Sequence, residues 1–210
     1  MKPKNLPESL AARGRPRNFD RQEALVSALG VFWRRGYEPA SLNELCAAMN
    51  IKPPSLYAAF GNKAALFLEA VNYYEDTFWD ATWERMLKEA DLHQAISDFF
   101  CEAADILTSQ SVPCGCLVVL AAINVSPDSQ EVYEAVKALR EEGRGYFLAR
   151  LKQGVEDGQL DKNEDINGIA MTLNTLLEGM SIPAQDGISR KELAKIAVQA
   201  VKLLPRSSKA

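Results

Sequence analysis

The sequence predicts an all-α protein with a small N-terminal three-helix domain, which contains a helix-turn-helix, and a larger helical C-terminal domain. One observation is that residues suited to capping a helix N-terminus are followed three positions later by Glu or Gln. These pairs are Asp20 with Glu23, Ser41 with Glu44, Asp91 with Gln94, and Ser189 with Glu192. A second is that apolar residues between them recur at the three- and four-residue spacing of an amphipathic helix.

The bulk composition predicts a cytoplasmic protein without a membrane partner. The most apolar stretch, residues 116–125, is too short to cross a bilayer, and the N-terminus lacks the pattern of a signal peptide. Four cysteines without such a signal indicate reduced thiols instead of a disulfide framework. With 210 residues, the chain can bury a substantial core.

Charge is distributed unevenly along the chain. Residues 1–63 contain ten Lys and Arg against five Asp and Glu, a net of +5, whereas the whole chain carries −4. The remaining 147 residues therefore carry −9. A basic segment joined to an acidic body fits a DNA-binding domain on a regulatory domain, because neutralising phosphates supplies much of the affinity for DNA. Solvated surface without a specific partner is the simpler alternative.

We expect residues 1–18 to form a flexible basic arm, because they combine Pro, Gly, Lys and Arg without an apolar period. Arg15 and Arg17 are candidate DNA contacts, since the negative potential of a narrow minor groove attracts arginine. A solubilising tail without specific contacts is the alternative.

Residues 19–63 are expected to form the three-helix domain. The first helix begins at Asp20 and ends near Gly36, a residue common where helices stop in the left-handed conformation. Phe32 and Trp33 are expected in its core.

The segment from Ser41 to Lys63 predicts two short helices joined by a tight turn. The first begins at Ser41 and ends near Asn50, which tolerates the left-handed conformation. The second begins at Pro53, since proline suits the first turn of a helix. This is the helix-turn-helix arrangement, whose second helix lies in the DNA major groove.

This N-terminal segment resembles the DNA-binding domain of the TetR family of bacterial transcription regulators. The resemblance rests on Phe19, Gly36-Tyr37, Ser41, Leu45, Ser55-Leu56-Tyr57, Phe60, Lys63 and Leu66-Phe67. It implies an all-helical homodimer that usually represses transcription and releases DNA when a small molecule enters the C-terminal domain. It also implies that the helix after the DNA-binding domain links the ligand cavity to the spacing of the two recognition helices.

The position of residues on the helix-turn-helix predicts which side chains reach DNA. Base edges are reached from the first turns of the recognition helix, which here carry Lys52, Pro53 and Ser55. Candidates for phosphate contact, in line with the resemblance, are Ser41, Tyr57 and Lys63. Tyr57 could instead be a core aromatic with a hydrated hydroxyl.

Residues 64–210 are expected to form the regulatory and dimerisation domain. We expect one long helix from Asn62 to about Lys88 and another from Asp91 to Leu107. Further helices are expected over residues 116–125, 127–158, 166–180 and 189–204, with Gly143 and Gly145 weakening the middle of the longest.

The candidate ligand-binding residues are Trp79, Trp83, Phe99, Cys116 and Phe147. Their apolar character suits a cavity, but it suits an ordinary helical core equally well.

Cys114 and Cys116 raise the alternative of metal or redox sensing, since thiolates bind soft metals and react with oxidants. Buried cysteine also packs as a small apolar residue. We expect neither a metal nor a cofactor.

The last two helices have apolar faces that suit a two-fold, four-helix dimer interface. The candidate interface residues are Ile169, Leu173, Leu176, Met180, Leu193, Ile196 and Ala200. The alternative is that these faces close the core of a single chain.

Together these observations predict a homodimeric, ligand-responsive regulator, a repressor released from a palindromic DNA operator by an unidentified small molecule. A protein that coats DNA without sequence preference is one alternative. A thiol enzyme is another, but the sequence has no nucleophile elbow, phosphate loop or Cys-x-x-Cys. We therefore expect no catalytic residues.

Overall fold

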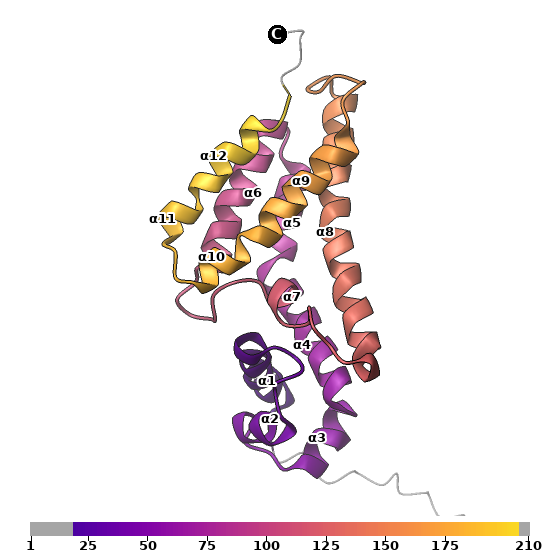
Figure 1. Ribbon diagram of the computed structural model, residues 1–210, viewed down its shortest axis with the longest axis vertical. Helices are drawn as coiled ribbons and strands as arrows, with labels where there is room; N and C mark the ends of the chain where they lie inside the picture. The colour runs from indigo at the N-terminus through magenta and orange to yellow at the C-terminus, as the bar shows by residue number, and fades with distance from the viewer. Residues whose placement is uncertain (1–18, 206–210) are drawn as a thin grey trace, which may run out of the picture.

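The computed structural model describes residues 19–205, and all regular secondary structure among them is helical, which confirms the all-α prediction. The arm over residues 1–18, with Arg15 and Arg17, lies outside the described residues. Figure 1 shows a small head formed by α1–α3 and the beginning of α4, and a body above it. The head elements are α1 Arg21–Arg35, α2 Leu42–Ala48, α3 Pro53–Phe60 and α4 Lys63–Phe78.

The body is an elongated helical bundle that includes the long helix α8 along one side (Figure 1). Its elements are α5 Asp80–Lys88, α6 Leu92–Leu107, α7 Leu117–Leu120, η1 Pro127–Ser129, α8 Gln130–Glu156, α9 Ile166–Gly179, α10 Ser181–Gln185, α11 Arg190–Leu193 and α12 Lys195–Lys202. None of the helices described is long and apolar enough to cross a membrane.

Helix starts lie where the capping residues predicted them. The side chains of Asp20, Ser41, Asn62, Asp91 and Ser189 each accept a hydrogen bond from a backbone N–H in the first turn of their helix. These bonds satisfy donors that have no partner inside the helix.

The expected helix over residues 62–88 is interrupted at one residue. Trp79 has φ of −113°, so α4 ends at Phe78 and α5 begins at Asp80. Its indole is only 3% exposed and its Nε1 donates to the Tyr74 hydroxyl at 2.8 Å. The local pattern of apolar residues cannot reveal this break, because burial of the indole depends on the surrounding bundle.

The expected helix over residues 116–125 is also wrong beyond Leu120. The carbonyl of Ala121 accepts a hydrogen bond from the backbone N–H of Tyr37 at 2.7 Å. The Ala121 carbonyl therefore pairs with the head, and the chain turns toward η1.

Helix α8 is continuous through its glycines, contrary to the expected weak point. A Cβ on Gly143 would lie 3.5 Å from the Trp83 ring and 3.3 Å from Asn174 Oδ1. The missing side chain thus allows α8 to pack closely against α5 and α9.

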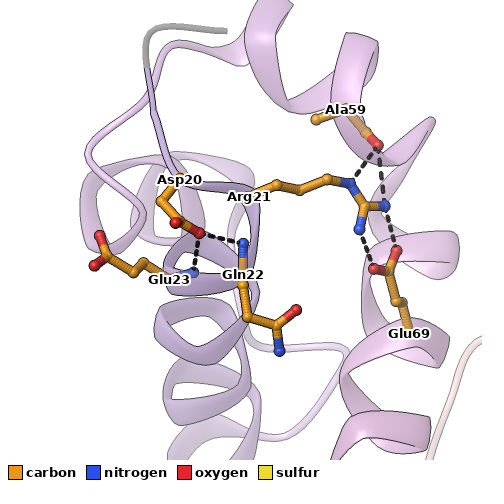
Figure 2. Close-up of polar contacts among 6 residues, drawn as sticks. All are labelled: Asp20, Arg21, Gln22, Glu23, Ala59 and Glu69. Carbon is orange, nitrogen blue, oxygen red and sulfur yellow. Dashed lines mark hydrogen bonds and ion pairs between the residues drawn. The ribbon is translucent and has the colours of Figure 1, made fainter.

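An ion pair clamps the recognition helix against its neighbours (Figure 2). The guanidinium of Arg21, at the start of α1, pairs with Glu69 on α4 and donates to the carbonyl of Ala59 at 3.3 and 3.4 Å. Its Cζ also lies 4.5 Å from the ring centroid of Phe60, within the range of a cation–π contact. One side chain thus joins α1, the end of α3 and α4.

We predict that Arg21→Met destabilises the protein by about 1 kcal/mol, since the clamp is partly exposed and charge-assisted. A double-mutant cycle with Glu69→Gln, measured by urea unfolding, should give a coupling of about 0.5–1 kcal/mol. Arg35→Met is the matched control, because Arg35 pairs with Glu44 at 3.2 Å but is 57% exposed. Additive effects of the two clamp substitutions would show that the pair contributes no coupling energy.

Candidate DNA-binding site and regulatory cavity

The N-terminal end of α3 forms an exposed edge of the head. Lys52 precedes the helix in extended conformation, and its carbonyl accepts from Ser55 N at 2.9 Å and from Leu56 N at 3.2 Å. Pro53 is exposed and Ser55 is half-buried. The three residues predicted to contact bases therefore lie together at the start of one helix, the part that enters the major groove in helix-turn-helix proteins.

Two of the predicted phosphate-contact residues are accessible. Tyr57 is 48% exposed, which argues against the alternative of a core aromatic. Ser41 is exposed while its Oγ accepts from Glu44 N at 3.1 Å, so its hydroxyl proton remains available to a phosphate. Glu44 faces Arg35, and no bond to the Ser41 N–H completes the expected capping box.

Lys63 is held more tightly than the sequence suggests. Its Nζ donates to the carbonyl of Glu38 at 3.1 Å and lies 4.5 Å from the ring centroid of Tyr37. Burial lowers the pKa of Lys63, and the nearby Glu38 carboxylate opposes that change. Lys63 thus joins the start of α4 to the turn after α1, and a phosphate contact requires its ammonium to leave this position.

The head is joined to the body by one buried and one exposed hydrogen bond that the sequence did not reveal. Trp33 Nε1 in α1 donates to the carbonyl of Gly115 at 2.9 Å. The carboxylate of Glu38 accepts from the backbone N–H of Ser126 at 2.7 Å, and this bond lowers the pKa of Glu38. The turn after α1 is therefore fastened to the segment on both sides of α7.

Aromatic side chains continue this junction toward the middle of the body. The rings of Trp33 and Tyr74 meet edge to face with centroids 4.7 Å apart. The Tyr74 hydroxyl accepts from Trp79, whose ring centroid lies 6.2 Å from that of Trp83. A chain of buried contacts thus runs from α1 in the head to α5 in the body.

A cavity between α4, α5, α7, α8 and α9 lies at the body end of this chain of contacts. The volume of the cavity is about 90 Å³, which is more than one ordered water molecule requires. Three of the five residues predicted to bind a ligand, Trp79, Trp83 and Cys116, line this cavity, and their role in binding stays a prediction.

Phe99 and Phe147 do not line this cavity. They are 2% and 0% exposed, and their ring centroids lie 4.3 and 5.3 Å from that of Trp83. They belong to the core behind that indole, because α6 and the inner face of α8 pack against each other there.

Sequence reasoning missed the acidic residues of the cavity. Glu75, Asp80, Glu142 and Glu178 line its wall, with Tyr146 and Arg140. Burial, reinforced by the charges of Asp80, Glu142 and Asp76, raises the pKa of Glu75 to about 8. Burial also raises the pKa of Asp80.

The Cys116 thiol is not poised for redox chemistry. Burial, followed by the charge of Glu75, raises its pKa to about 12, whereas reactive cysteines have lowered values. Within residues 19–205 no group of three or more His, Cys, Asp and Glu could hold a metal ion. Cys114 is half-buried and its sulfur lies 4.0 Å from the carbonyl of Ser109.

The predicted dimer-interface residues are divided between the core and the surface. Four of them are buried within the chain: Leu173, Met180, Leu193 and Ala200. Their side chains offer no surface to a partner, so their assignment to the interface is corrected. Ile169, Leu176 and Ile196 are half-buried. The large apolar side chains exposed on α9, α10 and α12 and just after α12 are Met171, Ile182, Val198 and Leu203. These exposed residues, and not the four buried ones, offer apolar surface to a partner.

Comparison with known proteins identifies the family. A family model described as "Bacterial regulatory proteins, tetR family" matches residues 24–70, and one described as "Tetracyclin repressor-like, C-terminal domain" matches residues 93–187. The chain is 36% identical over 199 residues to the HTH-type transcriptional repressor ComR of Escherichia coli strain K12, covering 92% of this chain and 93% of that protein. It is 25% identical over 187 residues to the repressor BdcR of the same organism, covering 89% and 90%.

One solved structure is similar to this chain in both its sequence and its fold. It contains a cysteine mutant of the TetR family regulator CifR complexed with 26-base-pair double-stranded operator DNA. The TM-score is 0.87 at 39% identity, and the match covers 91% of this chain and 100% of that chain. This chain therefore belongs to the TetR family of bacterial regulatory proteins and is a DNA-binding transcription regulator.

Proposed function

We propose that this protein is a homodimeric repressor that binds a palindromic operator and releases it when a small molecule occupies the body cavity. The observation that carries the proposal is the exposed N-terminal end of α3 on a head that a buried hydrogen bond joins to a cavity-bearing body. The repressor names of ComR and BdcR and the operator DNA bound to CifR support it.

Base reading is assigned to the start of α3. Lys52 can donate to guanine acceptors, Ser55 can bond either kind of base, and Pro53 can pack against a thymine methyl. Ser41 and Tyr57 are assigned to phosphates on either side, with Lys63 joining them if its ammonium leaves Glu38.

Dimerisation is assigned to the exposed apolar side chains of the last helices. Met171 and Ile182 are 56% and 58% exposed, and Val198 is 58% exposed. Apolar side chains of this size, left in water on α9, α10 and α12, are characteristic of an interface. A two-fold axis that passes through α9 and α12 would place this surface of one protomer against the same surface of its partner.

Ligand response is assigned to the contacts between the cavity and α1. A molecule in the cavity touches Trp79, which is hydrogen-bonded to Tyr74, and Tyr74 packs on Trp33 of the head. A ligand that prefers a shifted arrangement of these rings would move the population away from the DNA-binding form. The family is one of transcription factors and not of enzymes, so the thiol-enzyme alternative is set aside.

We predict that Lys52→Ala weakens binding to the preferred operator about tenfold and relaxes base preference, since one base contact is worth about 1–3 kcal/mol. The operator would come from selection out of a random DNA library at near-physiological salt, with affinities measured by fluorescence anisotropy. Lys162→Ala, an exposed lysine on the body, is the control. Selection of a palindrome favours a specific dimer, whereas an equal loss on all sequences would contradict base reading by Lys52.

The paired substitution Met171→Glu and Val198→Glu is expected to convert the protein to a monomer, because it buries charges in the proposed interface. Sedimentation velocity would measure the change in mass. Ile123→Glu is matched in exposure, at 55%, but follows α7 on another part of the surface, and it should leave the dimer intact. If the double variant is still a dimer, the interface does not lie at Met171 and Val198 and the assignment is wrong.

A further inference from the structure

The cavity wall carries more acid than its neighbouring side chains neutralise. Glu75 comes from α4, Asp80 from α5, Glu142 from α8 and Glu178 from α9, so the carboxylates approach from four helices. Arg140 is the one cation among the described residues that line the cavity. Its Nη1 donates to the carbonyl of Val118 at 3.0 Å, and it forms no ion pair within residues 19–205.

The four carboxylates differ in what they already bind. Glu142 accepts the hydroxyl proton of Tyr146 at 2.7 Å, and Glu178 accepts from the Asn174 amide at 2.8 Å. Neither Glu75 nor Asp80 has a side-chain hydrogen-bond partner among the residues described. Two acceptors are therefore available to a bound molecule.

Aromatic rings complete the wall. Trp79 and Trp83 are 3% and 7% exposed, and the ring centroid of Tyr146 lies 5.1 Å from that of Trp83. The rings of both pairs are inclined at 32°. Rings of this kind attract a cation to their faces, because their quadrupole is negative there.

We infer that the cavity binds an organic monocation with an apolar body, of the quaternary ammonium type, between the carboxylates of Glu75 and Asp80 and the indoles of Trp79 and Trp83. The inference rests on the proposed function, since it names the chemical class of the molecule that would release DNA. An anion would meet the acidic side chains of Asp80, Glu142 and Glu178, and the one cation of the wall, Arg140, already donates to the Val118 carbonyl. A neutral apolar molecule would leave Glu75 and Asp80 without a partner in a site of low polarity.

The protonation of Glu75 supports this assignment. Burial and the neighbouring carboxylates raise the pKa of Glu75 to about 8, so the empty cavity holds its proton at pH 7. A bound cation favours the ionised form. Cation affinity should therefore rise between pH 6 and pH 9 as that proton becomes easier to remove.

Other groups facing the site must be considered in the same pH range. Asp80 also has a raised pKa, caused first by burial, and Glu142, Glu178 and Arg140 line the same wall. The pKa values of Tyr146 and Cys116 are raised to about 12, so both keep their protons below pH 9. The variant Glu75→Gln isolates the contribution of Glu75 from that of Asp80.

Titration of the full chain with three matched probes tests the inference. The probes are phenyltrimethylammonium, its neutral isostere tert-butylbenzene and the anion benzoate, with binding followed by tryptophan fluorescence and calorimetry. Saturable binding of the cation, at least tenfold tighter than that of either other probe, is expected. Equal affinity for cation and isostere, or tighter binding of benzoate, would overturn the inference.

Glu75→Gln should weaken binding of the cation about tenfold at pH 8 and flatten the dependence on pH. This variant should fold, because removing an acid with a raised pKa relieves a penalty on the folded state that grows between pH 4.5 and pH 8. Glu156→Gln, an exposed acid at the end of α8, is the control and should bind like the parent. An unchanged affinity in a folded Glu75→Gln variant would also overturn the inference.

Adding saturating phenyltrimethylammonium to the operator complex separates this inference from the proposed function. Release of DNA supports both. Binding of the cation without release keeps the ligand class but contradicts ligand control of DNA binding. Absence of cation binding by a folded, operator-binding dimer overturns the ligand class and leaves the repressor proposal standing.

Discussion

The hydrogen bond from Trp33 to the carbonyl of Gly115 is the constraint on which the arrangement of head and body depends. Gly115 has φ of +83°, and a Cβ there would lie 2.6 Å from a Leu120 methyl and 2.9 Å from the Ser181 carbonyl. Only glycine fits this position. Because Trp33 also packs on Tyr74, the head and the body meet through buried aromatic side chains instead of across a hydrated boundary.

Helix α1 is therefore fastened at both ends by interactions of different kinds. At its start, the partly exposed Arg21 pairs with Glu69 and holds the end of α3 (Figure 2). At its end, Trp33 is buried and bonded to the body. Displacement of α1 at the body would be transmitted to α3 through the Arg21 clamp, which is the mechanical basis of our proposed ligand response.

Local signals were enough to predict where helices begin, because a cap such as Ser41 or Asn62 acts on backbone only three residues away. Features set by distant contacts could not be predicted from the same signals. The short α7 results from the bond between Tyr37 and Ala121, which are far apart in sequence. The acids of the cavity escaped notice because Glu75 and Glu142 resemble solvent-facing residues until α4 and α8 are placed together. Leu173 had the right periodicity for an interface, but periodicity does not distinguish a chain's own core from a partner.

The central claim is that the cavity and the head communicate through the aromatic contacts joining Trp79, Tyr74 and Trp33. The most direct measurement is the operator affinity of Tyr74→Phe, which removes only the hydroxyl bonded to Trp79 and keeps the ring. Because the account makes this bond a feature of the DNA-binding form alone, its loss at about 1 kcal/mol predicts an operator Kd about fivefold weaker. Tyr73→Phe, on the same helix and half-buried, should have no effect. Equal affinities for Tyr74→Phe and the parent, with a changed tryptophan fluorescence that shows the bond was broken, would contradict the account.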